Sequence, residues 1–199
     1  AITYLKKAEK TSSTGEQDVR DIVVNMLNEL ESGGDDRAVA YARDLDKWEG
    51  DIVITDETRE RARKMVSQKL QDDIRFAHDN VRRFAEAQRA SMTDVEIETI
   101  PGVILGHRNI PVNSVGCYVP GGKFPMVASA HMSVATAMVA GVPRIAAATP
   151  PFRGEPNPGV IAAMQMGGAH EIYVLGGIQA IGAMALGTET IEPVHMLVG

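Results

Sequence analysis

Apolar residues in the first half of the chain recur with the period of an α-helix. The first series spans residues 19–30 and consists of Val19, Ile22, Val23, Met26, Leu27 and Leu30. Gly33-Gly34 is expected to end this helix, because glycine readily adopts the left-handed cap conformation, and a second short helix follows over 38–45. An extended piece is predicted at 51–55. Residues 57–91 contain neither proline nor glycine, which predicts one long helix or two.

The pattern changes beyond residue 92. Polar and apolar residues alternate in DVEIETI, and the segments after Pro101-Gly102 also look extended, so a β-meander is predicted over 95–119. Apolar strands then alternate with small-residue helices. The strands are expected at 144–149, 171–177 and 194–199, and the helices at 126–141, 156–168 and 177–187. This alternation is typical of a parallel sheet with crossover helices.

These patterns predict an α/β fold in two parts. Residues 1–117 are expected to form a helical region and the short β-meander, and residues 118–199 an incomplete Rossmann-like sheet with crossover helices. The charges follow a similar division: residues 1–100 hold 16 Lys/Arg and 22 Asp/Glu, whereas residues 101–199 hold four of each. Such a charged half suits solvated helices, and such an apolar half suits buried strands. Because the last strand runs into the end of the sequence, the chain is expected to be a fragment.

Composition argues against several classes of partner. The net charge of -6 disfavours a nucleic-acid-binding surface, and no apolar run approaches the ~20 residues of a membrane helix. The first residues lack the apolar core of a secretory signal. Cys117 is the single cysteine, so no intrachain disulfide can form, and it is expected to be a small buried hydrophobe rather than a reactive thiol. A cytoplasmic location fits these features.

Spacing alone leaves the candidate chemistry open. The glycines of GGIQAIG, at 176–182, are out of register for the dinucleotide fingerprint GxGxxG. Gly176-Gly177 could offer backbone N–H groups to a phosphate where a strand turns into a helix, or could only allow close packing. The five histidines show no metal-ligand spacing. Among them His131 follows the turn-rich stretch GCYVPGGKFP, within reach of a ligand there, and Lys123 could steer an anion or simply face solvent.

Four motifs carry a resemblance to a known family. YVPGG, AMVAGVPRI, TPP and GGIQAI occur in this order within residues 101–199. Together they resemble the histidinol dehydrogenase family, and the helical half fits the opening of that family. The resemblance implies an NAD-dependent, zinc-containing oxidoreductase, a homodimer, that converts a small-molecule alcohol through an aldehyde to a carboxylate. It also implies that Tyr118 and Gln179 contact the dinucleotide, and we expect both at the same edge of the sheet.

Two departures from the family pattern shape the functional hypothesis. Lys123, Phe124 and SAHMS at 129–133 make the chain similar to the sulfopropanediol dehydrogenase branch, in which Lys123 and His131 would be donors for a sulfonate. The family's Glu-His pair, its zinc ligands and a further asparagine would follow Gly199, so no catalytic residue and no metal ligand is assigned here. The chain is therefore expected to be the NAD-binding part of such an enzyme. A histidinol dehydrogenase and a non-catalytic nucleotide-binding fragment are the alternatives.

Overall fold

Residues 13–90, within the charged half of the chain, fold into three helices, which are α1 (Ser13–Asp46), α2 (Asp56–Met65) and α3 (Gln68–Ala90). The structure is a computed structural model and describes residues 13–199. At the predicted break α1 kinks, because Gly34 takes a φ of 49° in the left-handed region. The segment predicted to hold one helix or two holds two, since the side chains of Thr55 and Ser67 each accept a backbone N–H and cap a helix start.

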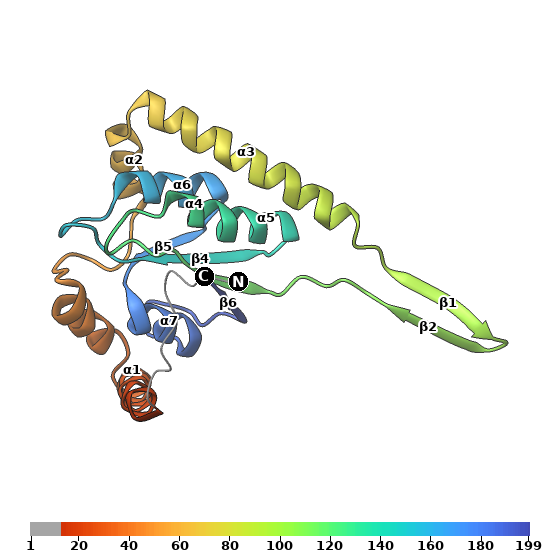
Figure 1. Ribbon diagram of the computed structural model, residues 1–199, viewed down its shortest axis with the longest axis horizontal. Helices are drawn as coiled ribbons and strands as arrows, with labels where there is room; N and C mark the ends of the chain where they lie inside the picture. The colour runs from red at the N-terminus through yellow and green to blue at the C-terminus, as the bar shows by residue number, and fades with distance from the viewer. Residues whose placement is uncertain (1–12) are drawn as a thin grey trace, which may run out of the picture.

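A four-stranded parallel sheet lies at the centre of the molecule (Figure 1). In the order in which they pair, its strands are β5 (Glu171–Val174), β4 (Arg144–Thr149), β3 (Ser114–Tyr118) and β6 (Met196–Val198). Ile145 and Ala147 of β4 belong to one core cluster and Ala146 and Ala148 to another, as the two-residue period of a strand requires. The predicted α/β fold with a parallel sheet is confirmed.

Helices cover both faces of this sheet (Figure 1). The remaining helices are α4 (Val127–Ala130), the π-helix η1 (His131–Ala135), α5 (Thr136–Ala140), α6 (Pro158–Gly167) and α7 (Gly177–Leu186). On one face α3 packs against α5 and α6, and on the other α1 packs against α7. The predicted helix over 126–141 is present, but a π-turn interrupts it, and Gly141 ends it with a φ of 84°. Within residues 13–199, no helix combines the length and the apolar character that a membrane span requires.

An antiparallel hairpin projects from the body of the molecule, beyond the end of α3 (Figure 1). It consists of β1 (Val95–Ile100) and β2 (Val103–His107), and all residues of both strands are exposed. The predicted meander over 95–119 is wrong in its third strand, because β3 pairs in parallel with β4 and β6. Burial explains the difference: the apolar segment SVGCY needs cover on both faces, which only the sheet provides. The strand also spans the expected boundary between residues 117 and 118.

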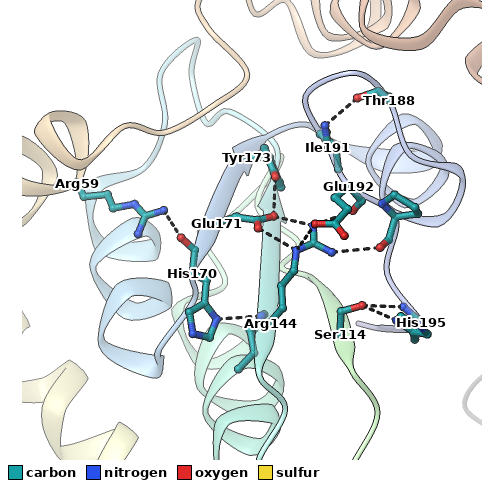
Figure 2. A network of polar contacts seen from close by, with 12 residues as sticks. Arg59, Ser114, Arg144, His170, Glu171, Tyr173, Thr188, Ile191, Glu192 and His195 are labelled. Atoms are coloured by element: carbon teal, nitrogen blue, oxygen red, sulfur yellow. Dashed lines mark hydrogen bonds and ion pairs between the residues drawn. The ribbon is translucent and has the colours of Figure 1, made fainter.

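A polar network fixes the amino ends of β4 and β5 (Figure 2). The guanidinium of Arg144 donates to both carboxylate oxygens of Glu171, each over 2.9 Å. It also donates to the carbonyl oxygens of Glu192 and Pro193, in the segment between α7 and β6, while the hydroxyl of Tyr173 donates to Glu171. This network therefore ties that segment to the sheet, at the end opposite the carboxyl ends of the strands.

Candidate functional site

The carboxyl ends of β3 and β5 lie at one edge of the sheet, because its strands are all parallel. Tyr118 is the last residue of β3 and is half-buried against the core cluster that α7 covers. Its hydroxyl oxygen accepts a hydrogen bond over 3.0 Å from the backbone N–H of Gly177, the first residue of α7. Gln179 lies in the first turn of the same helix. The prediction that Tyr118 and Gln179 share one edge of the sheet is confirmed.

Gln179 is buried, with 2% of its surface exposed, and its amide contacts a residue from the other half of the chain. Its Nε2 donates to Oδ2 of Asp46 over 2.9 Å, and the N–H of Gly176 donates to the same oxygen over 2.9 Å. Asp46 ends α1, and only the packing of α1 on α7 brings it here. Sequence reasoning missed this residue, because nothing distinguishes one aspartate among the many acidic residues of the charged half.

The two glycines at the start of α7 already use their backbone N–H groups. Gly176 donates to Asp46 and Gly177 donates to Tyr118, which favours the packing alternative over a phosphate contact. The packing alternative holds, since a Cβ on Gly176 would lie 2.6 Å from Oδ1 of Asp46 and 2.9 Å from Cβ of Pro150. Gly177 has a φ of 50°, a conformation that favours glycine.

Lys123 and His131 do not meet at the surface. Lys123 is exposed in the loop after Tyr118, next to Phe124. His131 is only 1% exposed, and its ring lies edge-on against the ring of His78 on α3, with centroids 5.8 Å apart. Burial lowers the pKa of both rings, which keeps both neutral at pH 7. The expectation that His131 is a donor beside Lys123 is therefore wrong.

The remaining candidate groups separate into those that fit a cofactor and those that do not. Cys117 is buried in β3, and burial raises the pKa of its thiol to about 11, which confirms a core role.

Among residues 13–199, no three His, Cys, Asp or Glu side chains gather as a metal site requires, so the described residues do not fit the implied zinc. At the edge of the sheet, the described groups that could hold a dinucleotide are the partly exposed Tyr118 and the amide of Gln179, whose Nε2 is bonded to Asp46. The contact of these two residues with NAD stays a prediction.

Comparison with known proteins gives the family. Residues 9–199 match the family described as histidinol dehydrogenase. A histidinol dehydrogenase homolog of Shouchella clausii is 48% identical over 199 residues, covering 98% of this chain and 47% of that protein. The sulfopropanediol 3-dehydrogenase of Ruegeria pomeroyi is 47% identical over 199 residues, covering 100% of this chain and 46% of that protein.

A solved structure shares the fold. The crystal structure of histidinol dehydrogenase from Elizabethkingia anophelis matches with a TM-score of 0.85 and 31% identity, over 98% of this chain and 43% of that chain. This chain thus spans less than half the length of the relatives named here. The match over nearly all of its residues shows that the chain belongs to the histidinol dehydrogenase family.

Proposed function

We propose that this chain is the cofactor-binding part of an NAD-dependent alcohol dehydrogenase, whose catalytic residues and zinc ligands lie elsewhere in the complete polypeptide. The observation that carries the proposal is the hydrogen bond from the N–H of Gly177 to the hydroxyl of Tyr118. It joins the motifs YVPGG and GGIQAI at the carboxyl edge of the sheet, where open α/β sheets bind their ligands. The family and the dehydrogenases among its relatives support the same proposal.

In the proposed reaction an alcohol is oxidised through an aldehyde to a carboxylate. When bound, NAD supplies the hydride acceptor for each of the two oxidations, while water contributes the second carboxylate oxygen and the protons pass to solvent. The residues of this chain bind and orient. Tyr118 offers its ring and holds the start of α7 through Gly177, and Gln179 offers its amide to the dinucleotide.

We propose sulfopropanediol as the substrate. The relative from Ruegeria pomeroyi that is named for this substrate is 47% identical. Lys123 is exposed in the loop directly after YVPGG, where its charge would attract a sulfonate and repel the cationic histidinol. With His131 buried, Lys123 is the exposed cation of this pair that could meet a sulfonate. Histidinol is the second candidate, because the solved histidinol dehydrogenase shares this fold at 31% identity.

Steady-state kinetics on the complete polypeptide, monitored through the formation of NADH, distinguish the two candidate substrates. We expect a higher kcat/KM for sulfopropanediol than for histidinol, and a loss of about tenfold for sulfopropanediol in Lys123→Ala, because a charge-assisted contact is removed. Lys64→Ala, at an exposed lysine of α2, is the matched control and should leave kcat/KM unchanged. A higher kcat/KM for histidinol would show that the substrate is wrong. If neither alcohol gives NADH, the proposal that the complete polypeptide is a dehydrogenase is contradicted.

The assembly and location of the enzyme are proposed from the family resemblance. We infer a homodimer in the cytoplasm, and light scattering on the complete polypeptide tests the first part. The remaining alternative is a non-catalytic nucleotide-binding protein. In that case the complete polypeptide would bind NAD and would form no NADH from either alcohol.

A further inference from the structure

Asp46 has a contact that the proposed cofactor role leaves unexplained. This half-buried residue ends α1, and its Oδ2 accepts hydrogen bonds from both the Nε2 of Gln179 and the N–H of Gly176, each over 2.9 Å. A carboxylate can only accept hydrogen bonds. The part of the Gln179 amide that faces Asp46 must therefore be the NH₂ group, which removes the usual ambiguity between the two ends of an amide.

The other end of the amide lies close to Gly177, the first residue of α7. Because Nε2 is held by Asp46, Oε1 turns toward Gly177, where a Cβ would lie 3.4 Å from this oxygen. Gly177 is exposed, and its N–H is already bound to the hydroxyl of Tyr118. Within the described residues Oε1 has no hydrogen-bond partner. The oxygen of Gln179 is thus a carbonyl acceptor that lies beside the contact between Tyr118 and Gly177.

We propose that Asp46 is a positioning residue that locks the amide of Gln179, so that the site presents a carbonyl oxygen to a hydrogen-bond donor of the dinucleotide. The donor is a ribose hydroxyl or an amide nitrogen, and the inference rests on the proposed function of this edge as the cofactor site. Phosphate oxygens do not fit the contact, because they are acceptors facing another acceptor. The carboxylate of Asp46 also lies at the start of α7, the position that would otherwise attract an anion.

A double-mutant cycle on the complete polypeptide tests this role, with the Kd for NAD measured by isothermal titration calorimetry and Tm recorded for each variant. Asp46→Leu is expected to weaken NAD binding about tenfold when Gln179 is present and less than about twofold in a Gln179→Leu background, because no amide is then left to lock. Asp46→Asn keeps an acceptor oxygen and should bind NAD within about threefold of the unmodified protein.

The outcomes of the cycle distinguish a role of Asp46 in positioning Gln179 from a role in packing alone. Equal losses in the two backgrounds would overturn the proposal in favour of packing through Gly176, and unchanged binding by Asp46→Leu would overturn it as well. Gln179→Glu gives a test that does not require Asp46→Leu to fold. It places two carboxylates in contact and should weaken NAD binding by more than about tenfold, so an unchanged Kd would contradict the lock. If Gln179→Leu binds NAD as well as the unmodified protein, or neither binds it, the proposed cofactor site fails instead.

Discussion

Two neighbouring histidines have buried ring nitrogens without a hydrogen-bond partner in the described part of the chain. Among the described residues, both ring nitrogens of His131 and the Nδ1 of His78 lack a hydrogen bond. Burial is the largest cause that lowers the pKa of each ring. For His78, Asp79 opposes the shift and Arg82 adds to it, and for His131 the neighbouring His78 adds to it. Both rings are therefore held neutral by the fold.

We expect the free energy of unfolding to fall as the pH drops below 6.5, the ordinary pKa of these rings. Below that pH the unfolded chain binds protons that the folded protein excludes, so the stabilisation present above pH 6.5 is lost. Each unit by which a pKa is lowered corresponds to about 1.4 kcal/mol. Urea unfolding from about pH 8 to about pH 5 measures the slope. His131→Phe keeps a ring in place and should make the free energy of unfolding depend less steeply on pH. An unchanged slope would show that other groups cause the pH dependence.

The hydroxyl of Tyr118 gives a second prediction for a single residue. Tyr118→Phe removes the acceptor for the N–H of Gly177 and should weaken NAD binding by about tenfold in the complete polypeptide, with little change in Tm. Tyr173→Phe is the matched control, because the hydroxyl of Tyr173 donates to Glu171 at the opposite end of the sheet. Equal Kd values for the two variants, measured by calorimetry, would count against a cofactor contact by Tyr118.

Among the elements of secondary structure, the sheet and the segment after α7 depend on Arg144 (Figure 2). The ion pair of Arg144 with Glu171 is partly buried, with side-chain exposures of 18% and 34%. Arg144→Met should lower the free energy of unfolding by about 2 kcal/mol, between the values for exposed and for fully buried pairs. Lys69→Met breaks an exposed pair with Asp73 and should cost less than about 0.5 kcal/mol. Urea unfolding measures both free energies. If Arg144→Met loses no more stability than Lys69→Met, the polar network of Arg144 does not stabilise the sheet as proposed.

At the scale of the whole molecule, the hairpin of β1 and β2 lacks cover (Figure 1). Large apolar residues are exposed along both of its strands, including Ile97, Ile100, Ile104 and Leu105. A two-stranded hairpin is only marginally stable in water, and contiguous apolar surface of this kind typically marks an interface. We therefore expect the hairpin to contribute to the proposed homodimer.

A cross-strand pair tests this expectation. Ile97 lies opposite Leu105, so Ile97→Lys combined with Leu105→Glu removes apolar surface while keeping a complementary pair. Light scattering should show a larger monomer fraction for this variant of the complete polypeptide. Glu96→Gln, at a neighbouring exposed position of β1, is the control and should leave the dimer intact. An unchanged dimer in the double variant would exclude the hairpin from the interface.

The sequence by itself determined the α/β architecture and the family. Apolar runs bounded by glycine and proline report burial on both faces, so they predict the strand at 144–149, which β4 matches, and one at 171–177, of which β5 forms the first four residues. The break at Gly34 follows from local backbone preference in the same way. The shared edge of Tyr118 and Gln179 was predictable too, because parallel strands present their carboxyl ends together.

Only the tertiary structure decided which distant residues meet. A local pattern does not encode the partner of a strand, and so the sequence predicts a meander that includes β3, although β3 pairs with β4 and β6. The contact of Asp46 with Gln179 joins residues 133 positions apart and depends on how α1 packs on α7. His131 is buried for a comparable reason, since η1 and α3 bring its ring against that of His78. In each case the deciding free energy comes from burial between elements far apart in the chain, which a local period cannot report.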